Sequence, residues 1–121
     1  MRLVFDLTVS TNAPYEARAM LDALAADLER ETLSDLRVVV SELVSNAVKY
    51  GPGNPVHVEL DVSAPTRVRG EVANHGDPAI APHIHERPGA HGGYGLRLVD
   101  ALSRAWGVRE GSTDVWFELG G

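Results

Sequence analysis

The feature that most constrains the fold is residues 36–51, which have the periodicity of a helix with one buried face. Its apolar side chains recur at helical spacing and form one narrow stripe: Leu36, Val40, Leu43 and Ala47. Glu42 and Asn46 are four residues apart, so their side chains lie on one side of the helix, next to that stripe. There, Glu can take a proton or orient a water, and Asn can offer its oxygen to Mg²⁺. An amphipathic helix with two polar boundary residues would show the same spacing, so the rest of the sequence has to decide.

Composition narrows the class of protein. The chain has 121 residues, which is ordinary for one domain with its own core, and we expect a single domain over 1–121. A net charge of −6 argues against direct binding to nucleic acid, which relies on neutralising phosphates. The absence of Cys excludes disulfides and thiolate metal sites. No apolar run is long enough for a signal peptide or a membrane span, so the sequence predicts a cytoplasmic protein.

Apolar periodicity predicts the element order strand, helix, helix, strand, strand, loop, helix, strand, strand. The expected helices cover about 14–30 and 36–51, the latter opened by Thr32-Leu-Ser-Asp35, and a third from Gly92 with Trp106 on its apolar face. The expected strands are 2–10, 56–62, 68–72, 107–109 and 115–119. This order predicts an α+β fold, a two-layer sandwich with a mixed, mostly antiparallel sheet of about five strands and helices on one face.

Two further segments can meet the Glu42 and Asn46 face around a phosphate ligand. Asn74 and Gly76 end a strand, where Gly allows a ligand to approach the backbone. The glycine-rich turn 92–95 opens the third helix, whose first N–H groups have no helical partner. A tight joint between loop and helix would explain the same glycines. The sequence lacks both the P-loop motif and the dinucleotide-binding motif.

The loop 75–91 is also rich in imidazoles, which suit Zn²⁺. These side chains are His75, His83, His85 and His91. A solvated polar loop has the same composition, and both interpretations stay open.

The three segments, taken in this order, resemble the Bergerat-fold, histidine-kinase-like (GHKL) ATPases. Glu42-Leu-Val-Ser-Asn46-Ala-Val-Lys-Tyr-Gly51 resembles their N box, and Gly93-Tyr-Gly95-Leu-Arg-Leu-Val99 resembles their second glycine box. Trp106-Gly-Val and Val115-Trp-Phe-Glu-Leu are similar to the closing strands of one branch. That branch comprises the small stand-alone domains of the anti-sigma-factor serine/threonine kinase type, which are abundant in actinobacteria.

The resemblance implies a role for each matching residue. Asn46 would ligate a Mg²⁺ that bridges the phosphates of ATP, and Glu42 would be the catalytic base that takes a proton from the attacking hydroxyl. The loop 77–91 would be the lid over ATP. The nucleotide-binding residues would be Asn74, Gly76, Gly93, Tyr94, Gly95 and Leu96.

One position departs from the family pattern. The first glycine box of the family reads Asp-x-Gly-x-Gly, and its Asp reads the adenine amino group, whereas this chain has Asn74-His75-Gly76-Asp77-Pro78. An Asn amide carries both an acceptor and a donor, so by rotating it could meet either adenine or guanine. We therefore expect weaker and less selective purine binding than in relatives with Asp.

The resulting functional prediction is an ATP-binding regulator similar to the anti-sigma-factor serine/threonine kinases. It would phosphorylate an anti-sigma antagonist, sequester a sigma factor, or do both. The resemblance also allows a homodimer through the first strand and helix. The alternative is a non-catalytic protein-interaction module of the same fold that binds nucleotide weakly or not at all.

Overall fold

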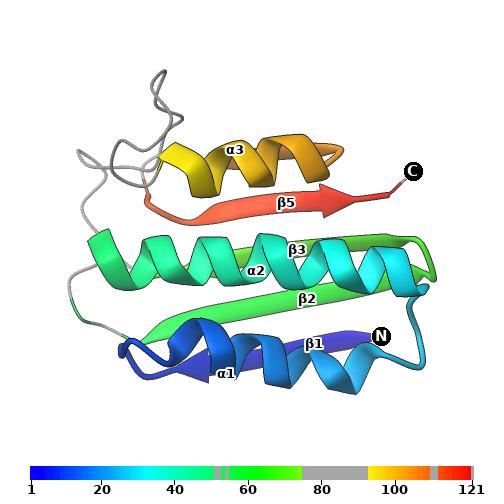
Figure 1. The fold of residues 1–121 in the computed structure, drawn as a ribbon, viewed down its shortest axis with the longest axis horizontal. Helices are drawn as coiled ribbons and strands as arrows, with labels where there is room; N and C mark the ends of the chain where they lie inside the picture. Colours follow the sequence, from blue (N-terminus) through cyan, green and yellow to red (C-terminus); the bar gives the residue numbers. More distant parts are fainter. Residues whose placement is uncertain (51–52, 54, 75–92, 110–111, 121) are drawn as a thin grey trace.

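The computed structural model describes residues 1–50, 53, 55–74, 93–109 and 112–120 (Figure 1). Its elements in chain order are β1 (Arg2–Leu7), α1 (Ala13–Met20), the 3₁₀ helix η1 (Leu21–Leu24), α2 (Arg30–Tyr50), β2 (Val56–Ala64), β3 (Arg67–Ala73), α3 (Gly93–Leu102), β4 (Ala105–Val108) and β5 (Val115–Leu119). This is the predicted order.

The described strands form one sheet in the order β1-β2-β3-β5-β4, and each adjacent pair is antiparallel. Helices α1, α2 and α3 lie side by side across one face of that sheet (Figure 1). The two-layer α/β sandwich predicted from the sequence is therefore confirmed, with an antiparallel rather than mixed sheet. Among the residues that the structure describes, no helix has the length and apolar character needed to cross a membrane.

The core lies between the two layers. Alternate strand residues such as Phe5, Leu60 and Phe117 point toward the helices and are buried, because successive side chains of a strand face opposite sides of the sheet. The stripe predicted on α2 is buried throughout, with no member more than 7% exposed. Val39 and Val44 are fully buried as well. The apolar face of α2 is wider than one stripe because α2 packs between α1 and α3.

The first helix ends earlier than the apolar spacing predicts. Instead of one helix over residues 14–30, α1 stops at Met20 and the chain continues into η1. Glu29 donates its backbone N–H to the carbonyl of Pro65 in the β2–β3 turn at 2.9 Å. Because this long-range bond holds the connection against the sheet, the chain turns there and α2 begins at Arg30.

Trp106 is a strand residue and not, as predicted, part of the apolar face of the third helix. Helix α3 ends at Leu102, and Trp106 pairs with Phe117 in the β4–β5 ladder. Its indole N–H donates to the carboxylate of Asp100 on α3 at 2.8 Å. Pairing with β5 satisfies the backbone of 105–108, so the sheet outcompetes a longer helix whose apolar spacing is equally good.

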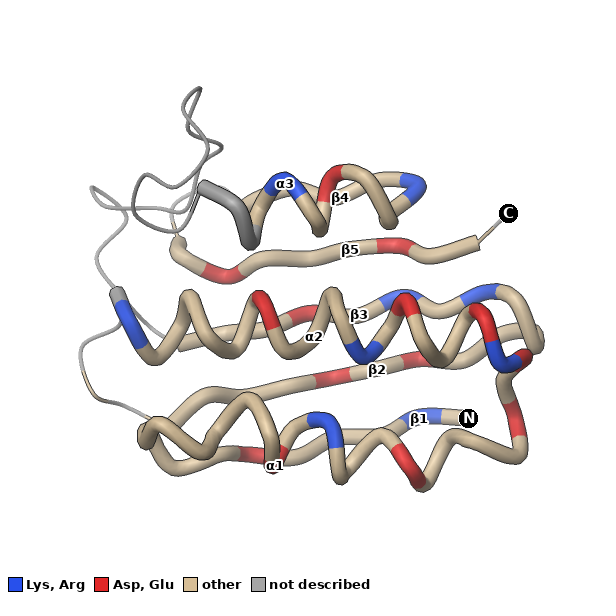
Figure 2. Tube along the Cα trace, viewed as in Figure 1, with Lys and Arg blue, Asp and Glu red and all other residues tan. Residues whose placement is uncertain are grey.

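The sheet face away from the helices carries charged side chains, and Figure 2 shows acidic and basic residues along β2, β3 and β5. His57 lies between two carboxylates, with Nδ1 at 2.7 Å from Asp6 and Nε2 at 3.0 Å from Glu59. Arg2 joins the cluster through Glu59 at 3.2 Å. Exposed ion pairs of this kind contribute little singly, but a His between two acids couples the cluster to pH.

We expect this cluster to make stability depend on pH. Hydrogen bonds to Glu59 and then to Asp6 raise the pKa of His57 above its ordinary value of 6.5. The contribution is fully present below pH 6.5 and is lost as the pH rises through the raised pKa of the folded state. The melting temperature of wild type should therefore exceed that of His57→Gln most near about pH 5–6, where His57 is charged and Glu59 is still ionised, with the difference shrinking as the pH rises. A difference that stays constant over that range would contradict the linkage.

Candidate functional site

The predicted catalytic pair lies on the C-terminal half of α2. The side chain of Asn46 is buried, with the residue 8% exposed, and Glu42 is half-buried one turn earlier. At this spacing the Cβ atoms of neighbouring turns lie about 5–6 Å apart. Within the part of the chain that the structure describes, neither side chain makes a hydrogen bond or ion pair. An amide and a carboxylate that make no contact with other described polar groups, one turn apart at the edge of the core, form a candidate ligand site.

Asn74 joins this region from the sheet. It directly follows β3, is buried, and donates from Nδ2 to the backbone carbonyl of Ala47 at 3.3 Å. Its Oδ1 accepts a hydrogen bond from the hydroxyl of Thr113, just before β5, at 2.5 Å. The end of β3, the start of β5 and the C-terminal part of α2 are thus brought together, and Asn74 touches the residue that follows Asn46.

This geometry corrects the expected behaviour of Asn74. Rotating its amide would turn Oδ1 toward the carbonyl of Ala47 and set oxygen against oxygen. Both ends of the amide are already hydrogen-bonded in a buried place, so the orientation is set by the protein. An amide that adapts to either purine by rotating is therefore not supported.

Sequence reasoning missed Thr113. Its role follows from the register of β3 and β5, in which Val72 is opposite Val115, so that two residues further on Asn74 lies opposite Thr113. The strands themselves were predictable from alternation, but their pairing was not, since β5 is separated from β3 by a helix and another strand. A polar residue two positions before a predicted strand was the one signal available.

Helix α3 starts within the segment predicted as the second glycine box, whose role in phosphate binding stays a prediction. The helix begins at Gly93, so Tyr94 and Gly95 lie in its first turn, where backbone N–H groups have no helical partner. Leu96 is 2% exposed and packs in the core, so it can contact a ligand only through its backbone. Gly76 and the predicted lid 77–91 lie outside the described residues.

The histidine-rich loop also falls outside the part that the structure describes, so its predicted Zn²⁺ site stays a prediction. Over the described ranges, no group of three or more His, Asp or Glu side chains is arranged to hold a metal ion. A Mg²⁺ site of the kind implied here does not need such a group, because Mg²⁺ keeps several waters and needs one or two protein ligands.

Comparisons with known proteins agree with the fold. The family model of the histidine kinase-like ATPase domain matches residues 9–119, which include each predicted site residue. Among solved structures, the RsbU and RsbW domains of Rv1364c from Mycobacterium tuberculosis are similar, with 22% sequence identity and a TM-score of 0.69. The match covers 98% of this chain and 31% of that chain, so this chain spans about a third of its length. Curated protein sequences gave no match. The fold predicted from the motifs is confirmed.

Proposed function

The chain belongs to the histidine kinase-like ATPase domain family, and on that premise we propose that it binds ATP with Mg²⁺ and acts as a serine/threonine kinase of the anti-sigma-factor type. Nucleotide binding is what the family implies. The observation that carries the proposal for this chain is the buried amide of Asn46, which lies one turn from the half-buried carboxylate of Glu42. Neither group has a partner among the described residues.

The donor set suits Mg²⁺. The amide oxygen of Asn46 is a hard ligand, and one such ligand with phosphate oxygens and waters is a usual arrangement for this ion. When bound, Mg²⁺ would neutralise charge on the phosphates of ATP. In our proposal, the backbone N–H groups at the start of α3 from Gly93 to Gly95 bind phosphate oxygens, because a helix N-terminus favours anions.

Glu42 is proposed as the general base. Its carboxylate would take the proton from the attacking Ser or Thr hydroxyl while the γ-phosphoryl group is transferred. Asn74 is proposed to line the base pocket, held by Ala47 and Thr113 in the orientation described above. Positioning, rather than covalent chemistry, is the main demand of phosphoryl transfer, and residues on α2, β3 and α3 could meet it.

The proposed partners follow from the sequence resemblance to anti-sigma-factor kinases, supported by the likeness to a chain with RsbU and RsbW domains. They are a sigma factor, an anti-sigma antagonist with an acceptor Ser or Thr, or both. The cytoplasmic location and the homodimer stay predictions.

A non-catalytic interaction module is the second candidate, and one observation favours it. Asn74 stands where the family pattern has Asp, and its buried amide is bonded to the protein at both ends. A neutral amide loses the stronger, charge-assisted bond that a carboxylate could make with adenine. ATP binding would then be weak and the fold would serve partner binding alone.

A thermal-shift titration distinguishes the two candidates. A ligand at 100 times its dissociation constant stabilises the folded state by about 2.7 kcal/mol, so ATP with Mg²⁺ should raise the melting temperature by several degrees. Excess EDTA should remove most of that shift. If millimolar ATP with Mg²⁺ leaves the melting temperature unchanged, the kinase proposal is wrong and the interaction module remains.

A further inference from the structure

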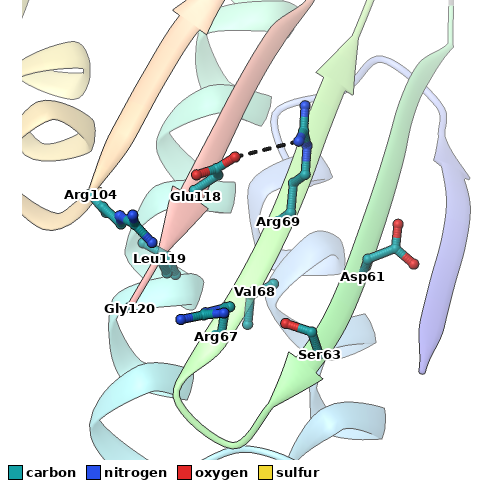
Figure 3. Close-up of a pocket in the computed structure, with 9 residues that line it drawn as sticks. All are labelled: Asp61, Ser63, Arg67, Val68, Arg69, Arg104, Glu118, Leu119 and Gly120. Atoms are coloured by element: carbon teal, nitrogen blue, oxygen red, sulfur yellow. Dashed lines mark ion pairs between the residues drawn. The ribbon is translucent and has the colours of Figure 1, made fainter.

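A second surface feature lies far from this site. A hollow of about 360 Å³ opens on the charged face of the sheet, beside the β2–β3 turn, where β2 and β5 end and β3 begins (Figure 3). Arg67 begins β3 and Asn74 follows its last residue. At about 3.3 Å per strand residue the two are about 23 Å apart. Arg67 also points to the face opposite α2, so the hollow and the proposed nucleotide site are separate.

Arginines dominate the hollow. Arg67, Arg69 and Arg104 line it together with two carboxylates, Asp61 and Glu118. Arg69 is already engaged, since it pairs with Glu118 at 3.4 Å and its guanidinium lies 5.9 Å from the ring centre of Trp116. Arg67 and Arg104 are exposed, and neither makes an ion pair or side-chain hydrogen bond within the described residues. Figure 3 shows their guanidinium groups near the end of β5, one on each side of the strand.

The backbone beneath these two arginines is firmly held. Gly120 has φ +80°, and a Cβ there would lie 1.5 Å from the carbonyl oxygen of Thr66, so only Gly allows the chain to pass this close to the β2–β3 turn. The N–H of Arg104 donates to the carbonyl of Glu118 at 2.8 Å. The backbone that carries Arg67 and Arg104 is therefore fixed by the fold, so only their side chains have to be ordered when they bind a ligand.

We propose that this arginine hollow is a docking site for an acidic, Asp- or Glu-rich segment of a partner protein. In a chain of net charge −6, two arginines that make no ion pair with the described residues form a local region of opposite sign. Planar guanidinium groups match carboxylates in two-pronged hydrogen bonds. Asp61 and Glu118 disfavour a compact phosphate dianion, whereas an extended peptide can place separate carboxylates beside Arg67 and Arg104 and pass over the open hollow.

The test is fluorescence anisotropy with a fluorescein-labelled peptide of alternating Glu and Gly. The peptide should bind the wild-type protein at low salt, and a peptide with Gln in place of Glu should not. Arg67→Gln with Arg104→Gln should weaken binding by about tenfold or more. The matched control is Arg18→Gln with Arg30→Gln, which removes the same charge from exposed positions on α1 and α2 and should change affinity by less than about twofold.

A second variant guards against a folding artefact. Ser63 is exposed in the hollow, and Ser63→Asp adds a carboxylate that should also weaken peptide binding. No binding by wild type, or equal weakening in both double variants, would overturn the proposal. So would release of the peptide by submillimolar inorganic phosphate, which would make the hollow a phosphate site. Asn46→Ala should bind the peptide like wild type, so that a failure of the kinase proposal leaves this one standing.

Discussion

Replacing Glu42 by Gln should lower phosphoryl transfer from ATP by about 10²–10⁴-fold and leave ATP affinity within about twofold. Gln has nearly the same shape as Glu but cannot take a proton from the attacking group. Glu42 makes no hydrogen bond or ion pair with the described residues, so its replacement should also leave the fold intact. A base acts on the chemical step, and the effect should appear in turnover rather than in binding.

Asn46→Ala, by contrast, should act on ATP binding. It deletes the proposed Mg²⁺ ligand, so ATP affinity should fall in the presence of Mg²⁺ and change little in EDTA. Ser45→Ala is the matched control, because Ser45 is the preceding residue on α2 and is exposed on the solvated side. Ser45→Ala should leave ATP affinity unchanged both with Mg²⁺ and in EDTA.

Both variants can be assayed before the protein substrate is known. Release of phosphate from ATP reports transfer to water, which Glu42 would activate as it does a hydroxyl, and calorimetry reports affinity. If Glu42→Gln and Asn46→Ala lose binding and turnover equally, the separate roles assigned to the two residues are wrong.

The parts of this site that depend on neighbouring residues in the sequence were predictable, and the parts that depend on contacts between distant segments were not. The apolar stripe of α2 and the one-turn spacing of Glu42 and Asn46 are local properties of a helix, and the structure has both. The start of α3 at Gly93 was also a local signal. Hydrogen bonds between distant segments were not predictable. The bond from Glu29 to Pro65 holds the connection between η1 and α2 against the β2–β3 turn, and the bond from Thr113 sets the orientation of Asn74.

The same difference between local and long-range signals applies to individual side chains. Trp106 fits the apolar face of a helix and the ladder of a strand equally well, and only the presence of β5 decides between them. Alternation placed His57 and Glu59 on one face of β2, but not Asp6, whose position follows from the register of β1 and β2. Residues whose role depends on which strands are neighbours could be assigned only from the structure.

Asn74→Asp should destabilise the protein although it restores the residue of the family pattern. In wild type the Nδ2 group donates to the carbonyl of Ala47 at 3.3 Å. A carboxylate would set one oxygen against that carbonyl while the other still accepts from Thr113. The loss of a donor in a buried place costs about 1–3 kcal/mol, and more when a charge is buried. Asn74→Ser, which is small and uncharged, is a control for the loss of the amide alone.

The loss of stability caused by Asn74→Asp should depend on pH. Burial and the facing carbonyl should raise the pKa of the introduced carboxyl above the ordinary Asp value of about 3.9. In its protonated form the carboxyl can donate to the Ala47 carbonyl as the amide did. The folded state then binds more protons than the unfolded state, so stability relative to wild type should fall as the pH rises from about 4. Urea unfolding at several pH values measures this, and a cost that does not vary with pH would show that the site is hydrated.

Nucleotide titration of the same variant tests whether Asn74 reads the base. A carboxylate accepts from the amino group of adenine and repels the O6 of guanine, so Asn74→Asp should tighten ATP and weaken GTP. The stronger, charge-assisted bond is worth on the order of 1 kcal/mol over a neutral one, or several-fold in affinity. ATP should then recover part of the stability that the substitution removes, and the ATP-induced rise in melting temperature should exceed that of wild type. If ATP and GTP affinities match those of wild type while stability falls, Asn74 is a structural link between α2, β3 and β5 and does not contact the base.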